Sequence, residues 1–296
     1  MKSGTTSRST PYSGRVQTEV DRPSDAPVGQ RPPILVATGV RKVYRTGAES
    51  VEALRDIDLT VDAGEFLAVM GPSGSGKTTL LNCLSGLDEI DGGRIEIDGE
   101  DLTAMSDARR TAHRAKAMGF IFQAFNLIPV FTATENVELP LLLAGTAPKK
   151  ARAAAQNTLS QVGLGHRLNH RPPELSGGEQ QRVTIARALA GQPKIVWADE
   201  PTGNLDTETA AQVMGLLDEL HKEGLTIILV THDKEIGATA ERRIEVRDGR
   251  IVSDERLVGT ARAGNGVDLR SPGGNQPPGR SDRPRAREAG RDSNLP

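Results

Sequence analysis

The most constraining feature of this 296-residue sequence is the octapeptide GPSGSGKT at Gly71–Thr78. It follows a continuous apolar run, FLAVM at Phe66–Met70, and precedes a segment with helical character that extends to Leu84. A short apolar run that ends at a glycine is typical of a strand buried on both faces. The pattern of Gly, four residues and Gly-Lys-Thr between such a strand and a helix predicts a phosphate-binding loop. A glycine-rich loop that merely happens to precede a lysine would leave this context unexplained.

The predicted loop has a specific chemistry. Its glycines let successive backbone N–H groups converge on phosphate oxygens, and the start of the helix adds partial positive charge. Lys77 is expected to reach the β- and γ-phosphates, the Thr78 hydroxyl to bind Mg²⁺, and Thr79 to touch the α-phosphate. The residues of the loop assigned to the nucleotide are Gly71, Ser73, Gly74, Ser75, Gly76, Lys77, Thr78 and Thr79.

A second apolar strand, within IVWADE at Ile195–Glu200, ends in two carboxylates. Ligands of open α/β sheets bind beyond the carboxyl ends of the strands, so these carboxylates are expected near the loop. Asp199 is the predicted metal-side carboxylate. Glu200, on the emerging loop, is the candidate general base for a water in line with the γ-phosphate. Asp-Glu pairs also arise by chance, but the position after a buried strand favours function.

The hexapeptide LSGGEQ at Leu175–Gln180 has two interpretations. Ser176 and Glu179 fit a capping box that opens a helix. The box does not explain Gly177 and Gly178, because glycine is unfavourable in a first helical turn unless the backbone approaches something closely. A Gly-Gly helix start with a serine hydroxyl suits a γ-phosphate, so Ser176, Gly177, Gly178 and Glu179 are predicted to contact nucleotide.

Strand and helix patterns alternate along the middle of the chain. Between the predicted strands Ile195–Ala198 and Thr226–Val230, apolar residues at positions 213, 216, 217 and 220 form one helical face. Strand, helix and strand make the unit of a parallel sheet, which predicts an α/β fold. The Asp-Gly pairs at positions 98–99 and 248–249 predict two hairpins that flank this core.

Three regions complete the predicted organisation. Residues 124–190 are expected to form a helical insertion, with a stripe at positions 151, 155, 159 and 162 that ends at Gly163. Residues 1–33 and 259–296, rich in Ser, Pro, Gly and charge, are predicted to be a disordered extension and tail around an ATPase domain at 34–258. A binding arm is the alternative for the tail, which is weakened because acidic residues alternate with its arginines.

Composition excludes some classes of partner. The 37 basic and 39 acidic residues leave a net charge of -2, so the whole chain offers no electrostatic case for nucleic acid. Its apolar runs fall short of the roughly 20 residues that cross a bilayer, and the N-terminus lacks the apolar stretch of a secretory signal. A cytoplasmic protein is therefore expected. The single cysteine, Cys83, is predicted to be a small buried apolar residue.

Together, GPSGSGKT, LSGGEQ, IVWADEPTGNLD and the histidine of LVTHD resemble the nucleotide-binding subunit of ABC transporters, over about Leu35–Val252. The resemblance implies a P-loop NTPase with a mixed core sheet, an antiparallel β subdomain and a helical insertion. It implies that Gln123 senses Mg²⁺ and the γ-phosphate, and that His232 is the switch histidine. It also assigns Asp206 to the D-loop and Tyr44 to stacking on adenine. The predicted catalytic residues are Lys77, Gln123, Glu200 and His232. The predicted metal ligands are Thr78, Gln123 and Asp199.

In this family two subunits pack head to tail, so the P-loop of one chain and the LSGGEQ of the other close on the same ATP. The resemblance therefore implies a homodimer that hydrolyses ATP. The segment Phe125–Gly145 and the octapeptide DEPTGNLD resemble the lipoprotein-releasing, macrolide-exporting and cell-division group. This implies a separate transmembrane permease of the FtsX-like type, export or mechanotransmission as the function, and a position at the inner face of the cell membrane.

Other functional classes fit less well. A DNA-repair or chromosome-organising ATPase of the family would need a long coiled coil or zinc modules between GPSGSGKT and LSGGEQ, where there is no room. A translation factor would need two ATPase domains in one chain. A small-molecule kinase would use the P-loop but leave LSGGEQ without a role.

Overall fold

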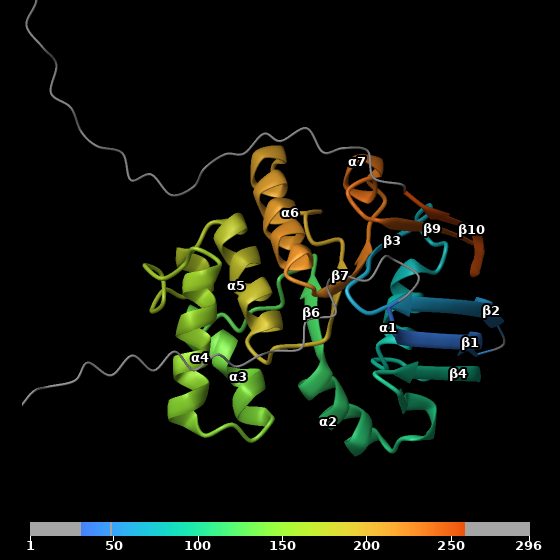
Figure 1. Ribbon diagram of the computed structural model, residues 1–296, viewed down its shortest axis with the longest axis horizontal. Helices are drawn as coiled ribbons and strands as arrows, with labels where there is room; N and C mark the ends of the chain where they lie inside the picture. The colour runs from blue at the N-terminus through green and yellow to red at the C-terminus, as the bar shows by residue number, and fades with distance from the viewer. Residues whose placement is uncertain (1–30, 48, 258–296) are drawn as a thin grey trace, which may run out of the picture. The chain divides into compact units, whose positions relative to one another are not determined.

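The computed structural model describes residues 31–47 and 49–257 (Figure 1). The predicted C-terminal tail and nearly all of the predicted N-terminal extension lie outside these residues. The described chain contains two sheets and the helices that cover them. The core sheet has the strands β3 (Phe66–Met70), β6 (Met118–Phe122), β7 (Ile195–Asp199), β8 (Thr226–Val230), β9 (Arg242–Arg247) and β10 (Arg250–Arg256).

The core sheet has the order β10-β9-β3-β8-β7-β6, and β10 alone runs antiparallel to its neighbour. The predicted mixed sheet is thus confirmed. Val230 of β8 pairs with Val69 of β3 on one side and with Asp199 of β7 on the other. The GPSGSGKT loop and the two carboxylates therefore emerge at the same edge of the sheet.

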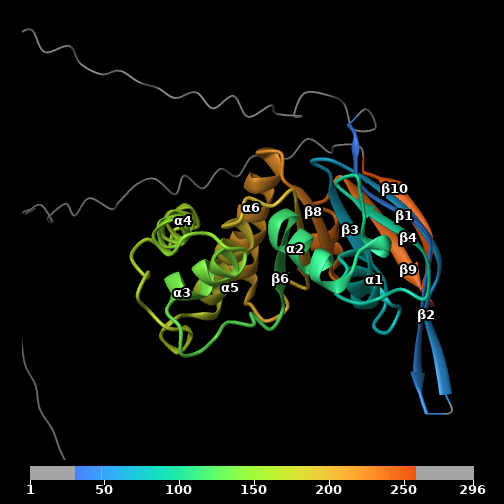
Figure 2. The ribbon, with the colours of Figure 1, turned by 90° about the horizontal axis from the view of Figure 1, so that it is seen from below.

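The second sheet is antiparallel, with the order β2-β1-β4-β5. Its strands are β1 (Pro33–Thr46), β2 (Glu49–Asp62), β4 (Gly92–Ile97) and β5 (Glu100–Asp101). The hairpin predicted at Asp98-Gly99 joins β4 and β5, and the one predicted at Asp248-Gly249 joins β9 and β10. The long hairpin of β1 and β2 was not predicted; Figure 2 shows it reaching past the other strands.

The described helices are α1 (Lys77–Leu84), α2 (Asp107–Ala117), α3 (Ala133–Leu143), α4 (Pro148–Gln161), α5 (Gly177–Leu189), α6 (Thr207–Lys222) and α7 (Lys234–Gly237), with short 3-10 turns at Leu102–Ala104 and Pro172–Glu174. Helices α3, α4 and α5 lie on one side of the core sheet and the antiparallel sheet lies on the other (Figure 1). Within residues 31–257, the helices are all too short or too polar to cross a bilayer.

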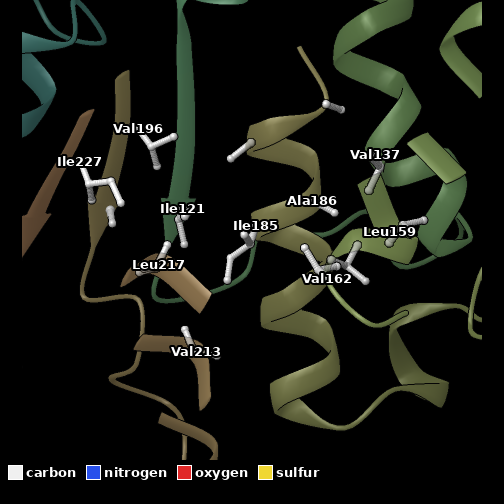
Figure 3. Close-up of a cluster of buried hydrophobic side chains, with 14 of the residues drawn as sticks. Ile121, Val137, Leu159, Val162, Ile185, Ala186, Val196, Val213, Leu217 and Ile227 are labelled. Carbon is white, nitrogen blue, oxygen red and sulfur yellow. The ribbon is translucent and has the colours of Figure 1, made fainter. Parts of the chain in front are cut away.

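Alternating residues of the core strands belong to two separate apolar clusters, one on each face of the sheet. Phe66, Val196 and Ile227 face a cluster that includes α4, α5 and α6, as Figure 3 shows for Val196 and Ile227. Leu67 and Trp197 face the other cluster, with α1 and the antiparallel sheet. The fully apolar strands follow from this burial on both faces. The predicted stripe of α4 is buried in the first cluster, and Cys83 is buried in the second.

An ion network around the buried Arg242 joins the two sheets. Arg242 of β9 forms a bidentate pair with Asp254 of β10, with both N–O distances 2.6 Å, and donates to the carbonyl of Thr60 of β2 at 2.7 Å. The same guanidinium lies 3.4 Å from the carboxylate of Glu65, which is fully buried. The Arg242 hydrogen bonds lower the pKa of Asp254 below its usual value.

We expect Arg242→Met to lower the free energy of unfolding by about 3 to 5 kcal/mol, because it leaves the Glu65 carboxylate buried without its cation. Urea unfolding followed by circular dichroism measures the change. The matched control is Arg243→Met, which breaks an exposed pair with Glu255 and should cost about 1 kcal/mol or less. Equal losses for the two variants would contradict the prediction.

Candidate nucleotide site

The loop between β3 and α1 is shaped by its glycines. Gly71, Gly74 and Gly76 have φ values of 148°, 76° and 102°, which side-chain-bearing residues rarely adopt. A Cβ on Gly71 would lie 2.1 Å from the carbonyl oxygen of Val246, and one on Gly76 would lie 2.8 Å from that of Ala53. The backbones of β9 and β2 therefore press directly on this loop.

The β9–β10 hairpin is hydrogen-bonded to the loop through its turn. The N–H of Gly249 donates to the Ser75 carbonyl at 3.0 Å, and the Gly249 carbonyl accepts from the N–H of Arg55 at 2.8 Å. The Ser75 side chain is buried and lines neither of the clefts described next. Sequence patterns gave no sign of this support, because its contacts are between backbone groups.

Two adjoining clefts, of about 830 and 580 Å³, open beside the loop. Ser73, Lys77 and Glu200 line both of them. The larger cleft is also lined by Gly71, which follows β3, and by His232, which follows β8. The predicted site residues that line the smaller cleft are Tyr44, Ser73, Gly74, Gly76, Lys77, Thr78, Thr79, Gln123 and Glu200. The structure thus gathers most of the predicted set at one place.

Lys77 begins α1 and folds back over the loop. Its ammonium donates to the carbonyls of Gly71 at 2.9 Å and Pro72 at 3.0 Å, and only 9% of the residue is exposed. The positive charge is therefore held at the loop, where the backbone N–H groups and the start of α1 also favour an anion.

Thr78 and Asp199 bring two oxygen ligands together. The Thr78 hydroxyl lies 3.4 Å from Asp199 Oδ1, and Gln123 lines the same cleft. Burial, and secondarily the neighbouring Glu200 carboxylate, raise the pKa of Asp199. Hydroxyl, carboxylate and amide oxygens are the ligands that Mg²⁺ takes when it also binds phosphates, so this donor set fits Mg²⁺.

Glu200 is held in an unusual backbone conformation. Its φ is +49°, a left-handed value that costs a non-glycine residue on the order of 1 kcal/mol or more, and its N–H donates to the Val230 carbonyl at 2.9 Å. Its carboxylate lies 2.8 Å from Nδ1 of His232. The His232 side chain is 71% exposed, whereas that of Glu200 is 18% exposed. A carboxylate and an imidazole thus lie within hydrogen-bond distance of each other, and both line the larger cleft.

Gln123 follows β6 and is positioned by the loop after Glu200. A Cβ on Gly203 would lie 2.6 Å from Gln123 Nε2, so the amide packs directly over this glycine. The side chain of Asn204 donates to the Gln123 carbonyl at 2.8 Å. Gly203 and Asn204 belong to the segment PTGNLD, but neither carries a charged side chain that would mark it as a site residue in the sequence.

Tyr44 lines the smaller cleft and lies near Thr79. Its hydroxyl donates to Asp88 at 2.7 Å, and the Lys42 ammonium lies 5.0 Å from its ring centroid. Burial and the bond to Asp88 raise the pKa of Tyr44. The ring is thus anchored beside the loop, and its contact with adenine stays a prediction.

The LSGGEQ segment forms the start of α5. The predicted capping box is present: the N–H of Glu179 donates to Ser176 Oγ at 3.2 Å, and the Ser176 N–H donates to the Glu179 carboxylate at 2.9 Å. A Cβ on Gly178 would lie 2.3 Å from Thr209 Cγ2, whereas one on Gly177 would meet only ordinary contacts. Part of the demand for glycine at Gly178 therefore comes from packing against α6.

The Ser176–Glu179 segment lines neither cleft, and neither does Asp206. Asp206 instead caps α6, where its carboxylate accepts from the N–H and the hydroxyl of Thr209. The two predicted anion-binding motifs of the chain therefore do not line a common cleft.

Comparisons with known proteins identify the family. The family model described as ABC transporter matches residues 54–203. An uncharacterized ABC transporter ATP-binding protein of Bacillus subtilis, YvrO, is 47% identical over 75% of this chain and 97% of its own length. The macrolide export ATP-binding/permease protein MacB of Brucella melitensis is 47% identical over 75% of this chain, which spans only 34% of that relative.

Solved structures give the same result. The dimeric structure of MJ0796, a bacterial ABC transporter cassette, has a TM-score of 0.71 and 43% identity over 76% of this chain and 99% of that one. A dimeric post-hydrolysis state of the same cassette, bound to ADP and Pi, also has a TM-score of 0.71, with 42% identity. The chain therefore belongs to the ABC transporter family, as one of its ATP-binding cassette ATPases.

Proposed function

We propose that two copies of this chain close on two ATP molecules, hydrolyse them and drive a separate membrane permease. The observation that carries the proposal is the separation of Ser176–Glu179 from the loop at Gly71–Thr78 within one chain. A twofold dimer places the motif of one copy against the loop of the other twice, so both sites become complete. The dimeric cassettes among the solved relatives support this arrangement.

The residues of the clefts have distinct roles in the proposed reaction. Lys77 and the loop N–H groups hold the β- and γ-phosphates. Thr78 and Asp199 would hold Mg²⁺, with Gln123 beside them, and the bound ion neutralises phosphate charge. Glu200 takes a proton from a water whose oxygen bonds to the γ-phosphorus. The bond from that phosphorus to the β–γ bridging oxygen breaks, and ADP and phosphate leave.

The permease is proposed to be a separate chain of the FtsX-like type, with export or mechanotransmission as the outcome and the inner face of the cell membrane as the location. The MacB relatives, named as ATP-binding/permease proteins, carry the matching region in a longer chain.

An apolar groove of about 430 Å³ between α2, β6, α3 and α5 is lined in part by Phe120, Phe122 and Leu141. Val130, which precedes α3, and Leu143, at the end of α3, are 70% and 79% exposed. This face is where the permease is proposed to dock.

Single cysteines at Val130 or Leu143 should crosslink to an integral membrane protein when the variant chain is expressed in its native cells and their membranes are treated with a crosslinker. Cys83 will not interfere, because burial raises the pKa of its thiol to about 12 and keeps it protonated. The control is a cysteine at Val252, which is 54% exposed on β10. Mass spectrometry identifies the product. Crosslinks to membrane proteins from position 252 alone would contradict the docking face.

A further inference from the structure

The turn after Gln123 contains two consecutive residues in the left-handed conformation, Phe125 with φ 56° and Asn126 with φ 52°. Neither is a glycine, so each pays an energetic penalty that surrounding contacts must offset. The turn lies between Gln123, which lines the cleft, and the groove beside α5. A strained segment at this place needs a specific support.

Arg187 of α5 provides that support. One guanidinium nitrogen donates to the carbonyl of Asn126 at 2.6 Å and another donates to that of Phe125 at 2.8 Å. Both carbonyls belong to the left-handed residues. The planar fork of arginine can serve two acceptors at once, whereas the point charge of lysine cannot reproduce this geometry.

The turn is also tied to the start of α5. A Cβ on Gly177 would lie 4.0 Å from Phe125 Cζ, so the phenyl ring lies beside the first glycine of LSGGEQ. On the other side, the Asn204 amide holds the Gln123 carbonyl. The backbone from Gln123 to Asn126 is therefore fixed at both ends, by the loop after Glu200 and by α5.

We propose that Arg187 is a positioning residue for ATP hydrolysis: it holds the left-handed turn at Phe125-Asn126 and thereby sets the place of the Gln123 amide in the cleft. The inference rests on the proposed role of Gln123 at the nucleotide. Arg187 itself lines the groove beside α5 and not the clefts at the loop, so it acts only through the turn.

The test measures ATP hydrolysis by the full chain. Arg187→Met and Arg187→Lys should both lower kcat, by about ten- to a hundredfold for Met, because a displacement near 1 Å at a positioned group has effects of that size. KM for ATP should change little. The matched control is Arg152→Met, which removes the partner of the buried Glu138 in the same helical region without touching the turn. An equal loss of kcat for that control would show that general destabilisation is the cause.

Two further measurements make the test specific. In a Gln123→Ala background, Arg187→Met should cost nothing further, because both changes act on the same amide. Asn126→Gly, which removes a left-handed penalty, should restore most of the rate to the Arg187→Lys chain even if the Met variant fails to fold. Additive losses with a slow Gln123→Ala chain would overturn this inference alone. A Gln123→Ala chain with normal turnover would overturn the role of Gln123 and this inference together.

Discussion

Glu200→Gln is expected to slow ATP hydrolysis by about 10² to 10⁴, the effect of losing a positioned general base. The amide has nearly the same size and can still accept a hydrogen bond from His232, so the loop should keep its shape. ATP will bind but remain uncleaved, and an ATP-bound dimer will accumulate. Phosphate release measures the rate, and gel filtration with ATP measures the dimer.

The control for this variant is Glu235→Gln. Glu235 is an exposed carboxylate at the start of α7, three residues after His232, and it lines neither cleft. Its loss removes one negative charge near the site but no acceptor of the water proton. Near-normal turnover by the Glu200→Gln chain would remove Glu200 from the base role.

The second large effect is expected from a pair of inactive chains. Lys77→Ala removes the charge that holds the β- and γ-phosphates, and Gly177→Asp places a carboxylate where the partner's γ-phosphate is expected, a like-charge contact. With Glu200→Gln in both chains, neither homodimer should trap ATP. A mixed dimer has both lesions in one site and none in the other, so it should trap one nucleotide.

Gly177 is the better position for this test than Gly178. A side chain on Gly178 would strike Thr209 of the same chain and disturb the cap of α6, which would confuse a defect within the chain with a defect between chains. Gly177→Ala controls for added bulk. Two affinity tags isolate the mixed dimers, and bound nucleotide is counted per dimer. If such dimers trap none, the shared site is wrong.

Much of the fold was predictable because it depends on local patterns. The core strands β3, β7 and β8 appear as continuous apolar runs, and the two Asp-Gly turns locate their hairpins. The strands β1 and β2 escaped prediction because bulges break their alternation. In β1 the buried residues Ala37 and Val40 are three apart, with Gly39 at φ 56° between them. In β2 the residue Asp56, at φ 49°, has the same effect.

Helix α2 was missed for a different reason. Its sequence, DARRTAHRAKA, has no apolar stripe, and Ala117 alone among its residues is buried. A helix that contributes so little to the core leaves no periodic signal, although Ser106 and Asp107 mark its start. Sequence patterns therefore detect elements that bury many side chains in the core more readily than elements that bury few.

The same distinction applies to the site. Lys77, Thr78, Asp199 and Glu200 were predicted from chemistry because a nucleotide site needs side chains of these types at these positions. Arg187 and Asn204 could not be found in that way, because they bind backbone carbonyls, and a carbonyl has the same identity in every residue. Which carbonyls these two side chains bind depends on how distant segments of the chain are brought together, and this is known only from the three-dimensional structure.

Trp197 gives the protein an optical label of its own. It is the chain's one tryptophan, it is fully buried in β7, and its indole N–H finds no acceptor among the described residues. Light absorbed selectively by indole is therefore emitted from a single site two residues before Asp199, shielded from water and from dissolved quenchers. The emission carries no contribution from residues 1–30 or 258–296, which contain no tryptophan, so during unfolding it reports on the surroundings of β7 alone.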